Sequence, residues 1–491
     1  MVIVGGVVMS PRIVIAGGGL AGLAAAVALT DRGFPCTLLE SRPRLGGRAS
    51  SFHDMTSNTD IDNCQHVTLG CCTNFRHFCE RVGLQGFFRR EPALYFVGPG
   101  GKINPFAAGW LPAPLHLTGA FARLSYLSWS DKLSLARGLK ALVGPVSPAD
   151  ESQPFSAWLK KHHQTPTTIE RFWFVVLVSA LSESLERISV SHARKVFVDA
   201  FLAHRDGWYV DIPSVPLEEL YGGLLTEWLT SRGTTIRLQS AANQVEMSGD
   251  HVSGIRLGSD EVIVGDEFVV ALPFFRVMSI LPSMLQTHPD LQGIERLESA
   301  PISSIHLWLD RPIMDLPHVV LVDRVSQWVF NRTVVGASTN AGDAKPGVVK
   351  VVEGGSSLEQ AHYYQIVISA SHQLASKSKS ELEQIVLQEL AEIWPEAAKA
   401  KLLHSRHVTE HRAVFSPLPG VDLLRPSQQS PIPNLQLAGD WTKTEWPATM
   451  EGAVRSGFLA AENILRRMGQ PAAVLQPPLK TAWLSRWLFG L

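Results

Sequence analysis

The sequence has few cysteines, no excess of charge and no long uninterrupted apolar run. Its 491 residues include only 5 cysteines, an odd number, so a disulfide framework is excluded as the main source of stability. The 44 lysines and arginines are balanced by 45 aspartates and glutamates, which argues against the basic surface that nucleic acids require. Hydrophobic residues make up 45% of the chain, a globular composition with enough material for roughly two to four domains.

Membrane-spanning and secretory signals are also missing from the sequence. The longest apolar run, residues 13–29, contains four glycines and is shorter than a bilayer span. The opening segment MVIVGGVVMSPR lacks the basic start and the small-residue cleavage site of a secretory signal. We therefore expect a cytoplasmic protein that does not cross a membrane, with either Met1 or Met9 as its first residue.

Four of the cysteines lie in or near one unusual polar stretch, DNCQHVTLGCCTN at residues 62–74. The stretch suggests a metal site, a disulfide knot or the lining of a pocket. The spacing C-x6-C-C-x6-C, from Cys64 to Cys79, does not match the short spacings of zinc sites, so no metal is predicted. Small buried thiols in a reducing compartment explain the cysteines better. Pocket lining is the remaining interpretation.

The first strong motif is RIVIAGGGLAGLAAAVALTDRGFPCTLLE, which predicts a strand, a tight turn, a helix and a second strand. Gly17 permits the turn, Gly19 lets the backbone approach a diphosphate, and Gly22 lets the helix pack against the strand. Glu40 ends the second strand, where a carboxylate holds a ribose hydroxyl. A diphosphate is favoured at the helix N-terminus by free N–H groups and the helix dipole. The sequence therefore predicts a dinucleotide site in an α/β domain.

The next segment, ESRPRLGGRAS, resembles the R-x-G-G-R extension of the flavin amine oxidase and phytoene desaturase superfamily. The resemblance implies FAD as the cofactor. It also implies that Gly46 and Gly47 bring backbone close to the diphosphate and that Arg48 supplies positive charge to it. The alternative for this segment alone is a surface turn with solvated arginines.

Two later segments are similar to the same superfamily. Residues 234–257, followed by EFVVALP, resemble its second cofactor segment, which implies that Val245 meets the adenine through its backbone. Residues 434–465 resemble its closing motif, which implies that Asp440 contacts the ribityl–diphosphate portion and that Met450 lies at the flavin ring. A helix starting near Glu451 would then stabilise negative charge on the reduced ring.

The predicted fold class is α/β, with a Rossmann-type FAD-binding domain interleaved with an α+β substrate domain. The two insertions between the cofactor segments are rich in apolar and aromatic residues, which pack a core or line an apolar tunnel. The predicted boundaries are residues 1–75, 216–284 and 406–470 for the FAD-binding domain, 76–215 and 285–405 for the substrate domain, and 471–491 for a C-terminal tail.

The tail LKTAWLSRWLFGL has apolar residues at a spacing of four. Leu479, Trp483, Trp487 and Leu491 predict one apolar helix face, with Lys480 and Arg486 on other faces. This pattern is typical of a helix that lies at a membrane interface, here the inner face of the membrane. A helix that docks on its own protein produces the same pattern, so both alternatives stay open.

The stretch at residues 62–74 resembles most closely one branch of the superfamily, the squalene-associated FAD-dependent desaturases or hydroxysqualene dehydroxylases. This resemblance implies replacement of the allylic hydroxyl of hydroxysqualene by hydride from N5 of reduced FAD. The product is squalene, for hopanoid or sterol synthesis. Its partners would be a long apolar isoprenoid substrate and an external reductant. Loss of hydroxide needs an acid, and His66 or Asp62 is the candidate; a structural histidine is the alternative for His66.

Other functions stay open at this point. A carotenoid or phytoene-type desaturase has the same architecture and oxidises a polyene. An amine oxidase would need a polar entry and an aromatic cage, which the sequence does not indicate. A non-enzymatic flavin-binding subunit of an isoprenoid synthase complex is the alternative from a different class. Glu40, Arg48 and Asp440 favour a working cofactor but do not exclude that subunit.

Overall fold

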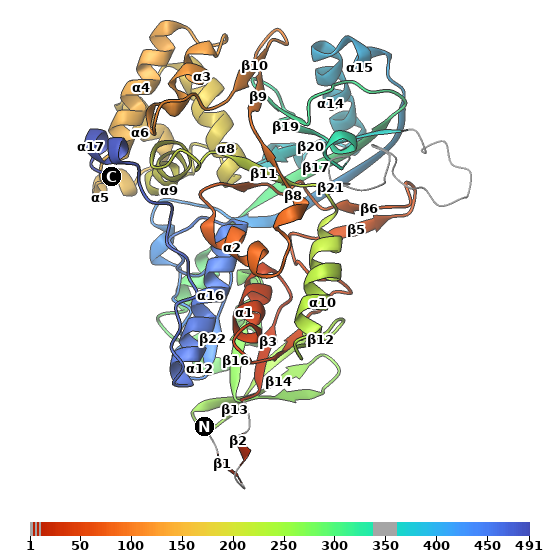
Figure 1. Ribbon diagram of the computed structural model, residues 1–491, viewed down its shortest axis with the longest axis vertical. Coiled ribbons are helices and arrows are strands. Elements are labelled where there is room, and N and C mark those ends of the chain that lie inside the picture. The colour runs from red at the N-terminus through yellow and green to blue at the C-terminus, as the bar shows by residue number, and fades with distance from the viewer. Residues whose placement is uncertain (1–2, 5–6, 9–10, 337–360) are drawn as a thin grey trace.

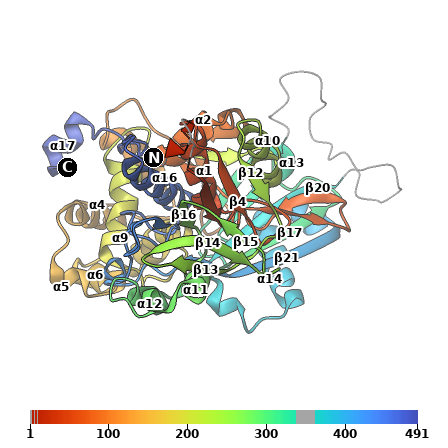
Figure 2. The same ribbon diagram turned by 90° about the horizontal axis from the view of Figure 1, so that it is seen from below.

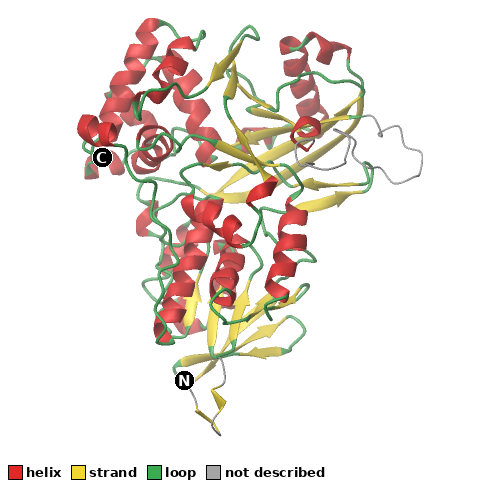
Figure 3. Cartoon of the chain, in the orientation of Figure 1, coloured by secondary structure: helices red, strands yellow, loops and turns green. Residues whose placement is uncertain are grey.

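The computed structural model describes residues 3–4, 7–8, 11–336 and 361–491. The two candidate first residues, Met1 and Met9, lie outside these ranges. Figure 1 shows a lower body built on a parallel sheet and an upper body built on a larger mixed sheet. Helices stand on both sides of the upper body, with the larger group on the left, while strands cross its middle (Figure 3).

The predicted strand–turn–helix–strand unit is present. β3 (Ile13–Ala16) is fully buried, α1 (Leu20–Thr30) follows the glycine turn, and β4 (Cys36–Leu39) pairs with β3 in parallel. The apolar run of β3 suits a parallel strand that is covered on both faces. This arrangement confirms the α/β fold class.

The parallel sheet has the strand order β12-β4-β3-β16-β22. β12 (Thr235–Arg237), β16 (Glu267–Val270) and β22 (Leu435–Leu437) come from segments far from β3 in the sequence. An antiparallel sheet of β13 (Ala242–Ser248), β14 (His251–Leu257) and β15 (Val262–Val264) adjoins it. The cofactor domain is therefore discontinuous, as the motifs indicated.

Three predicted domain boundaries need correction. The boundary at residue 75 cuts through α2 (Thr73–Arg81), whose apolar side pairs with the α1 core. The boundary at residue 284 cuts through α12 (Ser283–Gln286), which packs in the core of the parallel sheet. The boundary at residue 405 cuts through β21 (Leu402–Phe415), which belongs to the mixed sheet. The predicted boundaries lie near the ends of the cofactor motifs, and such motifs indicate ligand contacts. The end of a domain depends instead on which elements pack together in one core.

α1 and the C-terminal helix α16 (Met450–Arg467) lie side by side in the lower body (Figure 1). Small residues make this close approach feasible. A Cβ added at Gly457 of α16 would lie 2.2 Å from the Ala21 carbonyl oxygen of α1. Alanines fill most of the α1 surface, and all its residues are buried. The closing motif is thereby held against the glycine turn.

The mixed sheet has seven strands in the order β10-β9-β18-β19-β20-β17-β21. Its longest pairings join β17 (Ser299–Leu309) to β20 (His362–Ser369) on one side and to β21 on the other, all antiparallel. α14 (Lys379–Ile393) packs its apolar side on one face of this sheet (Figure 1). The remaining strands are β9 (Leu94–Val97), β10 (Ile103–Phe106), β18 (His318–Leu321) and β19 (Trp328–Asn331).

A helical lobe completes the upper body. Its elements are α3 (Thr118–Arg123), α4 (Trp129–Val143), α5 (Pro148–Glu151), α6 (Phe155–Lys161), α7 (Pro166–Thr168), η3 (Ile169–Phe174), α8 (Val175–Leu181), α9 (Val190–Lys195) and η4 (Val196–Leu202). η3 and η4 are π-helical, a rare geometry that is frequent at functional sites. The short sheet β7-β11-β8 joins this lobe to the stretch at residues 62–74, through β7 (Thr68–Leu69), β11 (Val210–Pro213) and β8 (Phe88–Glu91).

The tail forms a helix that is shorter than predicted. α17 covers Trp483–Phe489, so Leu479 and Leu491 lie outside it and do not extend its apolar face. In both Figure 1 and Figure 2, α17 lies at the edge of the helical lobe. Within the ranges that the structure describes, no helix has the length and apolar character needed to span a bilayer.

Candidate flavin site

The glycine turn after β3 has the geometry that the motif predicts. Gly17 has φ +111°, and a Cβ there would lie 2.4 Å from the Ala271 carbonyl oxygen. A Cβ at Gly22 would lie 1.9 Å from the Gly17 carbonyl oxygen. A Cβ at Gly19 would instead be tolerated, because it would meet only the Gly47 Cα, at an ordinary contact distance of 3.9 Å. Gly17 and Gly22 are thus required by the fold, whereas Gly19 is not.

A second glycine loop faces the first. The Gly46 amide donates to the Gly18 carbonyl at 2.9 Å, and a Cβ at Gly47 would approach the Gly19 Cα to 3.1 Å. Gly46 and Gly47 both have positive φ, +92° and +64°. The two loops therefore meet through backbone alone, at the N-terminus of α1. Such a cradle of bare backbone beside a helix N-terminus suits a diphosphate.

Glu40 lies directly after β4, beside the same turn. Its carboxylate is buried and accepts hydrogen bonds from the amides of Gly18 and Arg42, each at 2.8 Å. The buried acid is held in place by the two loops that a dinucleotide would contact. Its position at the end of the second strand matches the ribose-binding acid of dinucleotide folds.

Arg48 and Asp440 bring the first and last motifs together. Arg48 Nη2 lies 2.7 Å from Asp440 Oδ1, and Arg48 Nη1 donates to the Ala413 carbonyl at 2.7 Å. Burial disfavours the charge of Arg48, but the adjacent Asp440 carboxylate outweighs that effect and raises the pKa of Arg48. The site therefore holds a fixed positive charge next to a fixed buried carboxylate.

The N-terminus of α16 is bound to the stretch at residues 62–74. Thr449 caps the helix through its side-chain oxygen, which accepts from the Gly452 amide at 3.1 Å. Met450 is the first helical residue. The buried Glu451 carboxylate accepts from the backbone amide and the side-chain amide of Asn74, and from the Phe75 amide at 2.7 Å. One carboxylate therefore links the start of α16 to the start of α2.

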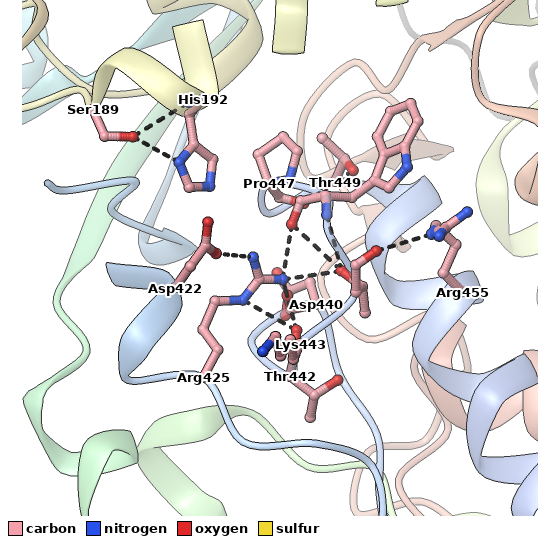
Figure 4. A network of polar contacts seen from close by, with 12 residues as sticks. Ser189, His192, Asp422, Arg425, Asp440, Thr442, Lys443, Pro447, Thr449 and Arg455 are labelled. Atoms are coloured by element: carbon pink, nitrogen blue, oxygen red, sulfur yellow. Dashed lines mark hydrogen bonds and ion pairs between the residues drawn. The ribbon is translucent and has the colours of Figure 1, made fainter. Parts of the chain in front are cut away.

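A buried arginine that the motifs did not indicate holds the loop before α16 (Figure 4). Arg425 donates to the backbone carbonyls of Asp440, Thr442 and Trp446 at 3.0, 2.6 and 2.8 Å from Nη2. Its Nη1 pairs with Asp422 at 2.7 Å. Burial lowers the pKa of Arg425, opposed by Asp422. The acceptors are carbonyls, which any sequence provides, so no sequence signal could have identified this role.

Asp62 is buried at the end of β6 (Thr59–Asp62). Its Oδ1 accepts from the Ser51 hydroxyl at 2.7 Å and from the Leu217 amide at 2.9 Å. Its Oδ2 is also buried and has no hydrogen-bond partner among the residues that the structure describes. A buried carboxylate oxygen without a partner is costly unless a ligand or a proton satisfies it. Asp62 therefore has one oxygen that supports the fold and one whose hydrogen-bonding capacity the described residues leave unused.

His66 is half-buried, and its ring Nδ1 lies 2.9 Å from the Cys64 carbonyl oxygen. Because a carbonyl only accepts, Nδ1 carries the proton, and Nε2 is an acceptor unless the ring is charged. Burial lowers the pKa of His66; the Asp62 charge raises it and the Arg48 charge lowers it further. The structure thus places His66 within electrostatic reach of both Asp62 and Arg48.

The comparisons with known proteins agree with this geometry. Residues 20–465 match the family model described as flavin containing amine oxidoreductase. The chain is 28% identical over 477 residues to the 15-cis-phytoene desaturase of Solanum lycopersicum. This match covers 93% of this chain and 78% of the relative. It is 26% identical to the 15-cis-phytoene desaturase of Synechococcus elongatus, over 94% and 97% of the two chains. The crystal structure of an oxidoreductase from Methanosarcina mazei has a TM-score of 0.68 at 16% identity, over 93% and 100% of the two chains.

The chain belongs to the flavin-containing amine oxidoreductase family. It is an FAD-dependent oxidoreductase. The residues present fit FAD on structural grounds, because the Gly46 and Gly47 loop and the N-terminus of α1 present bare backbone to one another and Arg48 supplies a cation beside them. Gly17, Gly19, Gly46, Gly47 and Arg48 would hold the diphosphate.

The other predicted cofactor residues lie around the same fold. Val245 is buried in β13 and packs in one cluster with Val14, Ala16 and Leu39 of the Rossmann strands, which leaves its contact with adenine a prediction. Met450 stands at the start of α16, next to the Arg425-bound loop. Among the described residues no His, Cys, Asp and Glu cluster has the geometry of a metal site. All five cysteines are free, and burial raises the pKa of Cys64 to about 12.

An apolar cavity of about 420 Å³ lies in the helical lobe. Its lining comes from β9, β10, α3, α4, η3, α8 and η4, and it includes Phe106, Phe172 and Phe197. Those three aromatics belong to the hydrophobic cluster against which Cys64 and Val67 pack, on either side of His66. The cavity walls and the His66 segment therefore share one hydrophobic core. Some aromatic residues of the insertion therefore fill the core and others line the cavity, while the apolar tunnel stays a prediction.

Proposed function

We propose that this FAD-dependent oxidoreductase acts on a long apolar isoprenoid, and that its reaction is the reductive dehydroxylation of hydroxysqualene to squalene. The observation that carries the substrate class is the apolar cavity of about 420 Å³ in the helical lobe, whose aromatic walls belong to the hydrophobic cluster against which Cys64 and Val67 pack. Its volume falls in the usual range of ligand pockets. Its aromatic and aliphatic walls would solvate a hydrocarbon chain and would exclude a hydrated polyamine.

The overall reaction replaces a C–OH bond by a C–H bond and releases water. It consumes two electrons and two protons. FAD, once reduced, supplies the two electrons and the hydrogen that forms the new C–H bond. The protein must supply the proton for the departing hydroxyl and must keep water away from the allylic carbon while that carbon is electron-deficient.

Two features of this chain support those protein roles. The buried Oδ2 of Asp62 accepts a hydrogen bond when ionised and donates one when protonated. The Nε2 of His66 becomes a donor when the ring is charged, because Nδ1 is committed to the Cys64 carbonyl. Either group would assist departure of hydroxide, and an apolar pocket around the substrate would limit capture by water.

The second candidate function is oxidation of a polyene, in which a C–C single bond loses two hydrogens to the flavin. The relatives named phytoene desaturase, at 26–28% identity over nearly the whole chain, favour it. The stretch DNCQHVTLGCCTN favours the dehydroxylase branch instead. A non-enzymatic flavin-binding subunit is the third candidate, and detection of either turnover would exclude it.

One anaerobic experiment tests the proposal. The protein is photoreduced, mixed with hydroxysqualene in detergent, and followed at 450 nm while squalene is measured by extraction. Oxidised protein mixed with phytoene is the parallel reaction. Reoxidation with formation of squalene is the expected result. Bleaching by phytoene without any reaction of hydroxysqualene would replace the proposal with the desaturase.

A further inference from the structure

The tail helix α17 has one face docked on the protein and one face exposed. On the docked face, Ser485 is fully buried and its hydroxyl donates to the Leu202 carbonyl at 2.7 Å. The Phe489 side chain lines the apolar cavity. On the exposed face, Trp483 and Trp487 are 65% and 76% exposed. Docking therefore leaves the two largest side chains of the helix in solvent.

The helix α4 also turns large apolar side chains outward. Trp129 is 75% exposed and Leu133, one helical turn later, is 53% exposed. Lys132 lies over the Trp129 ring at 4.8 Å from the centroid. Trp129, Lys132 and Lys140 line the same cavity as Phe489 of α17. α4 and α17, although about 350 residues apart in the sequence, therefore both contribute to the wall of one cavity.

The charge of these two segments differs from that of the whole chain. Residues 118–144 and 477–491 contain the basic residues Arg123, Lys132, Arg137, Lys140, Lys480 and Arg486. Their one acidic residue is Asp131, which is buried and accepts hydrogen bonds from Ser128 and Thr165 inside the lobe. The chain as a whole has a net charge of −1. The two segments that carry the exposed tryptophans are thus positively charged, whereas the whole chain is nearly neutral.

We propose that α4 and α17 together form a docking surface for a bilayer that contains anionic phospholipid. Tryptophan rings favour the headgroup level, where the ring is apolar and the indole N–H stays wet. Lysine and arginine extend their apolar stems along the acyl boundary and place their charges among lipid phosphates. A protein partner with an acidic surface would suit the cations but not three exposed tryptophans and an exposed leucine on two separate helices.

The cavity gives this surface a function. Docked in this way, α4 and α17 would hold the cavity that they both line close to the lipid. An apolar molecule would then enter the cavity without crossing water. This last step rests on the proposed isoprenoid substrate, whereas the docking surface does not. The tail then serves both as a wall of the cavity, through Phe489, and as a membrane contact, through Trp483 and Trp487.

Vesicle co-sedimentation of the FAD-loaded full chain tests the surface without substrate. We expect binding to phosphatidylcholine vesicles containing phosphatidylglycerol to be about tenfold tighter than to pure phosphatidylcholine, and to weaken with salt. The double variants Trp483→Ala/Trp487→Ala and Lys132→Gln/Lys140→Gln should each lower the partition coefficient about tenfold or more. The visible flavin spectrum and the thermal midpoint establish that each variant is folded.

The matched control is Met55→Ala/Leu423→Ala, which removes two apolar side chains that are 85% and 91% exposed elsewhere on the molecule. It should bind vesicles like the wild type. Equal binding by all variants, or no preference for phosphatidylglycerol, would overturn the proposal. Because substrate is absent, failure of hydroxysqualene turnover would leave this result unchanged, and the two proposals fail separately.

Discussion

Arg48 and Asp440 form an ion pair, 2.7 Å between Nη2 and Oδ1, although they are 392 residues apart in the sequence. The pair joins the loop after the first Rossmann strand–helix–strand unit to the loop before the last long helix. Both loops carry residues that the sequence predicts to contact the dinucleotide. The ion pair therefore fixes the width of the site before the cofactor binds, which reduces the ordering cost of binding.

Removal of either cofactor acid should weaken FAD binding. Glu40→Ala deletes a carboxylate that also organises the Gly18 amide, and Asp440→Ala leaves Arg48 without its partner. Loss of a charged hydrogen-bond partner costs about 1.5–3 kcal/mol, or roughly 10- to 100-fold in affinity. Fluorescence titration of the apo-protein measures the effect. Wild-type affinity in both variants would show that the dinucleotide lies elsewhere.

Arg425→Lys should weaken FAD binding without any direct contact between Arg425 and the cofactor. Lysine retains the charge but has too few donors, in the wrong geometry, for the carbonyls of Asp440, Thr442 and Trp446. Loosening this loop moves Asp440 and the start of α16. We expect a loss of roughly 1.5–3 kcal/mol of stability by thermal or urea unfolding. The FAD dissociation constant should also rise.

The control for that variant is Arg276→Lys on the exposed side of α11 (Phe274–Ile280). It should change neither the dissociation constant nor the unfolding midpoint. If Arg425→Lys lowers stability but leaves FAD affinity intact, Arg425 supports the fold only and does not position the cofactor loop.

Substitution of the catalytic acid should slow the reaction and spare FAD binding. His66→Ala and Asp62→Asn are compared in single turnovers, with reduced flavin and hydroxysqualene followed by stopped flow at 450 nm. Loss of a general acid costs about 10²–10⁴-fold in the limiting rate. A fall at one position alone identifies the acid. A change confined to apparent substrate affinity would mean that residues 62–66 line the pocket without donating a proton. Normal turnover in both variants would mean that another residue is the acid.

Stability should fall as the pH is lowered from about 6.5 toward 4. Burial lowers the pKa of His318 to about 4, with Arg89 adding to the effect, while the unfolded side chain binds a proton near pH 6.5. The unfolded state therefore binds more protons in this window, and stability rises with pH. His318 faces the buried Glu91, at 3.9 Å, and the Trp328 ring.

His318→Gln should reduce that pH dependence by up to about 1.4 kcal/mol per pH unit, the contribution of one proton. Urea unfolding between pH 7.5 and 4.5 provides the measurement, and the exposed His411→Gln is the control. An unchanged slope in His318→Gln would mean that other buried histidines, such as His116 and His192, account for the acid sensitivity.

The sequence by itself determined the cofactor half of this protein. Gly17, Gly19 and Gly22 act within one turn of chain, and Glu40 follows one strand later, so their chemistry is encoded by local spacing. The same holds for the capped start of α16, where Thr449 and Gly452 are neighbours on one helix. Local geometry depends on a few adjacent dihedral angles, and residue type alone restricts these.

Only the tertiary structure decided which distant groups meet. Arg425 binds carbonyls of a loop 15 to 21 residues away, and Glu451 reaches across 377 residues to Asn74. The apolar cavity is assembled from helices and strands whose side chains look like ordinary core residues in the sequence. The tail likewise has an amphipathic pattern, but its docking through Ser485 and Phe489 depends on a surface formed by η4 and the helical lobe. Such contacts form when whole helices and strands pack together, so the spacing of residues along one segment does not predict them.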